Sequence, residues 1–408
     1  MWWFNFLHFY QPANAEFYNI RKALDKSYWR LLRLMEEHPE LKMTFNISGC
    51  LLDRLAEEKE MAFIERLKFL VKKDRVELTG SAYYHGFLPL LPETEVVRQI
   101  KANEKALKKY FGKNFKPAGF FLPEMAYSPA VAKIIKRLGY DWLILDEVAY
   151  SGGKKIRPDF NRLYLDAASN LKIIFRSREM SSAYPPDKLW PILKNLAVGK
   201  FRVKKIGVAG SGEPLFITAT DAELYGLRHE DPTGEMEKIV KQKSLQTATF
   251  SERIKQLEKT KALKIKIWPA TWESSAAEVS SGQPYQLWQN KSNKIQVYLW
   301  KLAYLSLGLE NKFKKDKNYY WYRWHLARGL ASCTFWWASA RDFKPVFGPY
   351  AWSPDDIERG LEDLIRSVRS LHDPKTRRTK LEAEKYYLKI KTFIWEEHWK
   401  KHWPKQYE

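Results

Sequence analysis

The chain is poor in cysteine and has no long hydrophobic run. Its two cysteines among 408 residues, Cys50 and Cys333, each lie in an apolar stretch. They are most simply read as buried free thiols in a reducing compartment, although a bridge between them is left open. No stretch reaches the roughly 18 apolar residues of a membrane span, and residues 2–7 follow the first methionine without a basic leader. We therefore expect a soluble, cytoplasmic protein with no membrane partner.

The signatures of nucleotide and nucleic-acid binding are also missing. No glycine-rich phosphate loop follows the first apolar segment, which counts against a nucleotide-binding fold. The formal net charge is +22, yet the basic residues are mixed with acidic ones, as in 101–109 and 252–266, and form no basic tail. The composition predicts a solvated basic surface and no nucleic-acid partner. Attraction to anionic glycans or cell envelopes is left as the alternative.

The aromatic content, by contrast, is high. The chain has 17 Trp, 22 Tyr and 22 Phe, which make up 15% of its residues. Aromatic rings pack protein cores, and they also stack on sugar rings while the polar tips of Tyr and Trp form hydrogen bonds. So much tryptophan in a globular composition favours a carbohydrate ligand.

Over the first 290 residues, apolar segments of strand length alternate with segments of helical pattern. The predicted strands are 2–9, 41–47, 76–78, 118–122, 142–145, 171–175 and 214–219. The predicted helices include one capped by Asp25 and others over 94–110 and 128–138. This alternation is typical of parallel βαβ units, and six or more of them favour a barrel over an open sheet.

From about residue 290 the strand signal ends. Segments of helical composition follow at 293–308, 317–338, 353–371 and 375–400. No linker rich in Pro, Gly or Ser separates them from the preceding part. We expect a catalytic barrel over 1–290 and a helical domain over 291–408 packed on it.

Two carboxylates follow predicted strands. Pro123 cannot donate to a sheet ladder, so the strand should end there and release Glu124 at its carboxyl end. Asp221 follows the strand 214–219 in the same way. Catalytic groups of α/β barrels lie at this end of the strands. The alternative is that Glu124 is an ordinary loop residue.

Five segments, in order, resemble the sequence motifs of glycoside hydrolase family 57. They are 8–12, 77–89, 119–127, 220–226 and 330–342. The resemblance implies an α/β fold, an incomplete (β/α)7 TIM-like barrel followed by a C-terminal α-helical domain that contributes to the active site. It also implies cleavage or transfer of α-glucosidic bonds with retention of configuration, without metal or cofactor.

The resemblance assigns roles to individual residues. Retention needs two carboxyl groups about 5–5.5 Å apart, and Glu124 matches the nucleophile while Asp221 matches the general acid/base. His8 and Asp342 match residues that bind hydroxyls of the same sugar. The other expected substrate contacts, including aromatic platforms for which core packing is the alternative, are Gln11, His85, Phe121, Glu223, Arg228, His229, Trp272 and Trp337.

The chain departs from the family pattern at three points. Ala222 replaces a common glycine, so the turn after Asp221 must avoid a positive φ. Phe121 stands where a Trp often precedes the nucleophile, which preserves stacking but loses an indole donor. Arg228-His229 stands where some members have a Trp, which leaves room for a charged or phosphorylated glucan.

Several functions share these residues. We expect an amylase-type hydrolase of α-1,4-glucosidic bonds, with an α-glucan or maltooligosaccharide as substrate. A glucanotransferase or branching enzyme would use the same two carboxylates, and an α-galactosidase or a catalytically silent glucan-binding homologue is also left open. A metal-dependent deacetylase needs an Asp and a His-x-x-x-His pair, and the only such spacing, His398 and His402, lies on a charged terminal helix. The sequence gives no indication of oligomeric state.

Overall fold

The computed structural model describes residues 1–182, 191, 194, 207–208, 214–340 and 352–403. The chain divides into two compact units. The barrel unit comprises Met1–Gln11, Ala15–Tyr83 and Leu88–Pro284, and the helical unit comprises Pro12–Asn14, Tyr84–Phe87 and Tyr285–Glu408.

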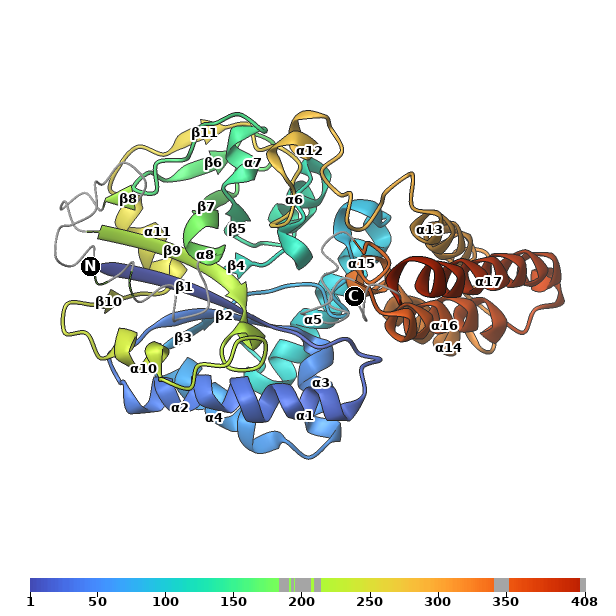
Figure 1. The fold of residues 1–408 in the computed structure, drawn as a ribbon, viewed down its shortest axis with the longest axis horizontal. Helices are drawn as coiled ribbons and strands as arrows, with labels where there is room; N and C mark the ends of the chain where they lie inside the picture. Colours follow the sequence, from blue (N-terminus) through green and yellow to red (C-terminus); the bar gives the residue numbers. More distant parts are fainter. Residues whose placement is uncertain (183–190, 192–193, 195–206, 209–213, 341–351, 404–408) are drawn as a thin grey trace. The chain divides into compact units, whose positions relative to one another are not determined.

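The barrel unit contains two largely parallel sheets (Figure 1). The first has the order β3-β2-β1-β9-β8, with β10 beside β1, and the second has the order β11-β6-β7-β5-β4. The strands of the first sheet are β1 (Trp2–Phe9), β2 (Met43–Ile47), β3 (Val76–Leu78), β8 (Gly207–Val208), β9 (Pro214–Asp221) and β10 (Gln246–Thr247). Those of the second are β4 (Gly119–Phe120), β5 (Trp142–Asp146), β6 (Tyr164–Asp166), β7 (Lys172–Arg176) and β11 (Leu263–Ile265).

Backbone hydrogen bonds join the two sheets along two seams. At the first, Gly80 N–H donates to Gly119 O and Phe121 N–H donates to Gly80 O, both at 2.9 Å. At the second, Ser177 N–H after β7 donates to Ile217 O of β9, also at 2.9 Å. Because neither seam is a continuous ladder of paired strands, the strands β1, β2, β3, β4, β5, β7 and β9 form an incomplete ring. These are the seven predicted strands, so the incomplete barrel is confirmed.

Helices cover the outside of the barrel. They include α3 (Gly49–Glu57), α4 (Met61–Lys72), α5 (Glu93–Phe111) and α6 (Pro129–Arg137). The first helical stretch runs through α1 (Phe17–Ala23), a π-helical turn Leu24–Tyr28 and α2 (Trp29–Glu37) without a break. The predicted helix cap at Asp25 is therefore wrong, because Ala23 and Leu24 before it are already helical. Asp25 is an exposed residue inside the π-helical turn.

Apolar side chains fill the ring and the layer between strands and helices. Inside the ring, Phe6, Phe121 and Trp142 belong to one buried cluster, and burial of each such side chain stabilises the fold by about 1.5–3 kcal/mol. Gly119 permits this packing, because a Cβ there would lie 2.1 Å from the Trp142 indole. The short strand β4 therefore requires glycine at this position.

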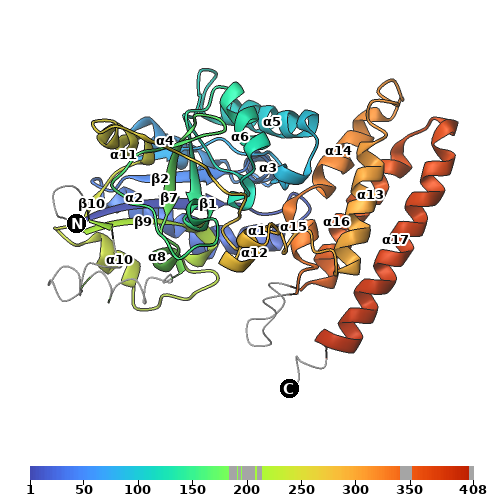
Figure 2. The same cartoon turned by 90° about the horizontal axis from the view of Figure 1, so that it is seen from above.

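The helical unit is built from long helices that run side by side (Figure 2). They are α13 (Lys294–Leu307), α14 (Tyr319–Gly329), α15 (Ser332–Trp336), α16 (Pro354–Ser370) and α17 (Arg377–Glu397). The predicted segment 317–338 is two helices, separated at Leu330–Ala331. In the part of the chain that the structure describes, no helix is both long and apolar enough to cross a membrane.

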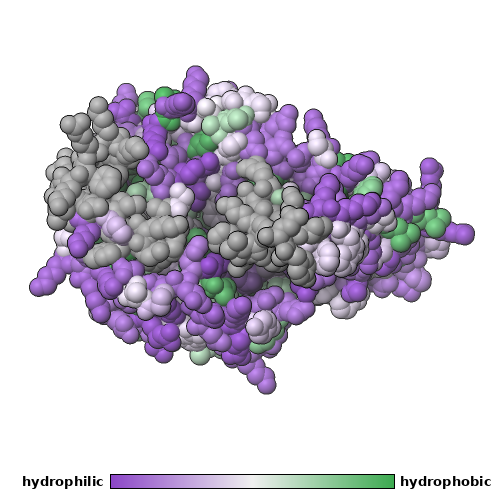
Figure 3. All heavy atoms as spheres, in the orientation of Figure 1, coloured by the Kyte–Doolittle hydropathy of each residue, from purple (hydrophilic) through white to green (hydrophobic). Residues whose placement is uncertain are grey.

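The described surface is mainly hydrophilic on the face shown in Figure 3. This agrees with 29% charged residues and a net charge of +22. Both cysteines are present as thiols, Cys50 buried and Cys333 half-buried.

Candidate functional site

Glu124 lies on a single 3-10 turn, Pro123–Met125, directly after β4. The strand ends at Phe120, two residues earlier than predicted. Glu124 has φ 61° and ψ 16°, and Met125 has φ 47°. Left-handed backbone in non-glycine residues is uncommon and is concentrated at functional sites.

Trp272 holds Glu124 by two hydrogen bonds. Its backbone N–H donates to Glu124 O at 3.1 Å, and its indole Nε1–H donates to Glu124 Oε2 at 3.0 Å. The strained turn and the carboxylate are thus both fixed by a residue from a distant loop. The sequence predicts Trp272 as a stacking platform, and this hydrogen bond is an additional role that sequence patterns do not reveal.

Asp221 is the last residue of β9 and pairs in register with His8 of β1. Arg228 Nη1 donates to Asp221 Oδ2 at 3.0 Å, and the Asp221 side chain is 23% exposed. Ala222 then opens the 3-10 helix Ala222–Leu224 and is not among the residues with positive φ. The expectation about this turn is confirmed.

His8 is buried and electrically neutral at neutral pH. Burial lowers its pKa to about 4, outweighing the opposing influence of the Asp221 charge. Asn46 donates its amide to Thr79 Oγ1 at 3.2 Å, so its Oδ1 is the acceptor in the 2.9 Å bond with His8 Nδ1. The proton therefore resides on Nδ1, which makes Nε2 a hydrogen-bond acceptor.

Ring contacts connect the surroundings of the two carboxylates. The His8 ring lies 4.6 Å from that of Phe121 and 6.2 Å, edge-on, from that of Trp272. A chain of contacts thus leads from Asp221 through His8 and Trp272 to Glu124, at the carboxyl ends of parallel strands. Phe121 is fully buried within this group. Its expected contact with substrate stays a prediction.

Glu223 and Gln11 bind each other. Gln11 Nε2 donates to Glu223 Oε1 at 2.9 Å, and the Tyr28 hydroxyl donates to the same oxygen. Glu223 is only 2% exposed, and its hydrogen bonds support the turn after Asp221; its expected contact with substrate stays a prediction. Burial raises its pKa to about 7, and the Asp221 charge acts in the same direction. Nothing in the sequence signals the contribution of Tyr28.

An ionic cluster of the buried Asp146 and Arg176 with the partly exposed Arg178 supports Trp272. Arg176 Nε donates to Asp146 Oδ2 at 2.8 Å, and Arg178 Nε donates to Asp146 Oδ1 at 3.0 Å. Both arginines also donate through Nη2 to Trp272 O, each at 3.0 Å. Sequence reasoning missed this cluster, although Asp146 and Arg176-Ser177-Arg178 lie at the ends of two predicted strands. Their position at the carboxyl ends of strands, as for Glu124 and Asp221, was the available signal.

The remaining expected residues are distributed over both units. His229 follows Asp221 in the barrel unit and is half-buried. His85 and Trp337 belong to the helical unit, where His85 Nδ1 bonds Ser332 Oγ at 2.8 Å and Trp337 is half-buried. Asp342 lies outside the described residues. The contribution of the helical unit to the site stays a prediction.

His398 and His402 both contact Trp352. Trp352 Nε1 donates to His398 Nδ1 at 3.3 Å, and the His402 ring stacks on Trp352 at 4.3 Å. Among the described residues, no group of three or more His, Cys, Asp or Glu side chains is placed to hold a metal ion.

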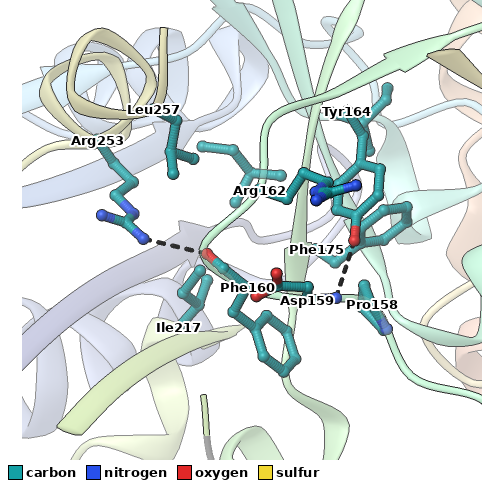
Figure 4. Close-up of a pocket in the computed structure, with 11 residues that line it drawn as sticks. Pro158, Asp159, Phe160, Arg162, Tyr164, Phe175, Ile217, Arg253 and Leu257 are labelled. Atoms are coloured by element: carbon teal, nitrogen blue, oxygen red, sulfur yellow. Dashed lines mark hydrogen bonds between the residues drawn. The ribbon is translucent and has the colours of Figure 1, made fainter. Parts of the chain in front are cut away.

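A small cavity lies beside the seam between β7 and β9 (Figure 4). Its volume is about 10 Å³, room for about one water molecule. Arg253 lines it and donates to Phe160 O at 3.1 Å, and burial lowers the pKa of Arg253 to about 10. None of the expected site residues lines this cavity, and it is too small for a sugar ring.

Comparison with known proteins places this site in a family context. The family model for glycosyl hydrolase family 57 matches residues 3–266. An alpha-amylase of Pyrococcus horikoshii is 29% identical over 170 residues, which are 41% of this chain and 26% of the amylase. This chain therefore spans about a quarter of the length of that relative.

Two solved structures share the fold. The GH57 branching enzyme of Thermococcus kodakaraensis aligns with a TM-score of 0.67 at 16% identity, over 95% of both chains. The 4-alpha-glucanotransferase of Thermococcus litoralis aligns with a TM-score of 0.67 at 15% identity, over 91% of this chain and 60% of that one. Since the family model covers more than half of the sequence, this protein belongs to glycosyl hydrolase family 57, a family of glycoside hydrolases.

Proposed function

We propose that this protein cleaves α-glucosidic bonds of α-glucans with retention of configuration, using Glu124 as nucleophile and Asp221 as general acid/base. The observation that carries the proposal is the chain of contacts from Asp221 through His8 and Trp272 to Glu124. Both carboxylates follow parallel strands of one incomplete ring, and retention requires two carboxyl groups on either side of one bond. Family membership supports the same chemistry.

The reaction is a double displacement. Glu124 attacks the anomeric carbon, the bond to the leaving oxygen breaks, and Asp221 gives that oxygen its proton. Asp221 then removes a proton from a water molecule, whose oxygen attacks the anomeric carbon and releases Glu124. The neutral His8 accepts a hydrogen bond from a sugar hydroxyl at Nε2. Arg228 places a positive charge 3.0 Å from Asp221 Oδ2.

Transfer to a sugar acceptor is the second candidate function. Relatives named as 4-alpha-glucanotransferases and as a branching enzyme match this chain beside those named as alpha-amylases. Transfer uses the same covalent intermediate and replaces the incoming water with a sugar hydroxyl. We favour hydrolysis of α-1,4 bonds, and a charged glucan remains a substrate candidate because Arg228 lies beside Asp221.

Incubation of the full chain with maltoheptaose, followed by mass analysis of the products, tests both functions. Shorter products alone indicate hydrolysis, and additional longer products indicate transfer. Glu124→Gln and Asp221→Asn should each lower turnover by at least about 10³-fold, whereas Glu230→Gln, an exposed carboxylate on a nearby loop, should retain it.

The outcome that contradicts catalysis is equally specific. If wild type binds maltoheptaose but its turnover equals that of Glu124→Gln, the protein is a glucan-binding homologue. A slow fluorinated glucosyl substrate adds a direct readout, because the trapped sugar should be attached to the peptide that contains Glu124.

A further inference from the structure

We propose that Trp272 is a positioning residue for the nucleophile, because its indole N–H fixes the carboxylate of Glu124 and the cluster Asp146–Arg176–Arg178 in turn fixes Trp272. This inference rests on the proposed function of Glu124. It assigns to Trp272 a role different from stacking on a sugar.

The hydrogen bonds restrict both the backbone and the side chain of Glu124. The bond from Trp272 N–H to Glu124 O, at 3.1 Å, holds the left-handed turn with φ 61°. The bond from Nε1 to Oε2, at 3.0 Å, fixes the rotation of the carboxylate. A glutamate side chain loses rotamer freedom when it is ordered. The two hydrogen bonds from Trp272 order this side chain in the folded protein, before substrate binds.

Trp272 is itself held on three sides. Its carbonyl accepts hydrogen bonds from Arg176 and Arg178, and the Arg176 guanidinium lies 5.4 Å from the centre of its ring. Asp146, 1% exposed, accepts hydrogen bonds from both arginines. Buried charges that are paired and fully hydrogen-bonded resist displacement, since breaking one pair leaves an uncompensated charge. These contacts restrict the position of the indole N–H of Trp272.

The chemistry of the donor suits a nucleophile. A neutral N–H orients a carboxylate and stabilises its ionised form, but it does not neutralise the negative charge as a Lys or Arg contact would. The two nearby arginines instead point to the Trp272 carbonyl and to Asp146. The cluster thus places a neutral donor at Glu124, while the guanidinium groups bind the Trp272 carbonyl and Asp146.

The test replaces the donor and keeps the ring. Trp272→Phe removes the N–H, and replacement of Trp272 by 3-benzothienylalanine exchanges N–H for sulfur in a ring of nearly the same shape. Trp268→Phe is the matched control, because Trp268 lies on the same loop with its ring beneath Lys266. Each full-length variant is assayed for kcat, KM, pH dependence and melting temperature.

We expect both Trp272 variants to lower kcat about 10- to 100-fold, the range for loss of a hydrogen bond to a charged group, with KM changed by less than about threefold. The acidic limb of the kcat profile should move to higher pH, because a carboxylate without its donor holds its proton longer. The control should match wild type.

The experiment distinguishes failure of the positioning role from failure of the proposed function. If Glu124→Gln is inactive but the benzothienylalanine variant matches wild type, the positioning role is wrong and the proposed function stands. A fall in kcat without a shift in the acidic limb of the pH profile also overturns the positioning role, because that pattern indicates only disturbed packing. If Glu124→Gln is as active as wild type, the proposed function fails and this inference fails with it.

Discussion

The buried carboxylate Glu223 should make the stability of the protein depend on pH. It accepts hydrogen bonds from Gln11 and Tyr28 and is 2% exposed. Burial, reinforced by the charge of Asp221, raises its pKa from 4.5 to about 7. Between these pH values the folded protein keeps a proton on Glu223 that the unfolded chain has lost.

The sign and size of the effect follow from linkage. The stability contributed by Glu223 is fully present below pH 4.5 and is lost as pH rises through about 7. The loss is on the order of 3 kcal/mol, since each pH unit of difference corresponds to about 1.4 kcal/mol. For a protein of this size, a loss of about 3 kcal/mol lowers the melting temperature by about 5–10 °C.

Glu223→Gln isolates this contribution, because the amide has a similar shape and does not titrate. Melting temperatures of wild type and variant are compared between pH 4.5 and pH 8. The wild type should lose about 5–10 °C relative to the variant over that range, and other titrating groups cancel in the difference. Glu230→Gln, an exposed carboxylate, should give a constant difference. A constant difference for Glu223→Gln, or one that favours wild type at high pH, would refute the reasoning.

Two further predictions concern the same edge of the barrel. Arg228→Met removes the ion pair with Asp221, whose side chains are 39% and 23% exposed. An ion pair this exposed contributes about 0.2–1 kcal/mol, so the melting temperature should fall by no more than about 4 °C, and a larger fall would contradict the prediction. Gly119→Ala places a Cβ 2.1 Å from the buried Trp142 indole and should cost about 1–3 kcal/mol, which thermal unfolding would report as a lower melting temperature.

The barrel could be predicted from sequence because its strands are buried on both faces. Segments such as 2–9 and 214–219 are continuous apolar runs, and their bounds agree closely with β1 and β9. The sequence missed β6, β8, β10 and β11, which have two or three residues each and are too short to produce a periodic pattern. It also placed a helix cap at Asp25, where a local preference of Asp was overridden by the packing of Leu24 and Tyr28.

The candidate site was only partly predictable, for a different reason. Glu124 and Asp221 follow strands, and this position can be recognised from the sequence alone. Which side chain touches Glu124 depends on how the chain closes in space, and Trp272 lies 148 residues away. Tyr28 reaches Glu223 across 195 residues in the same way. Long-range pairs of this kind have no local signal.

Phe121, which stands where a Trp is common, shows how such long-range contacts affect Glu124. A Phe three residues before Glu124 removes an indole donor from the strand itself, and the buried Phe121 ring packs against Phe6 and His8 instead. The indole that reaches Glu124 comes from Trp272, after β11, the last strand of the second sheet in the sequence. The geometry of Glu124 therefore depends on a residue that follows the second sheet in the sequence. A chain that ends before this loop would retain both carboxylates and lose the contact that orients one of them.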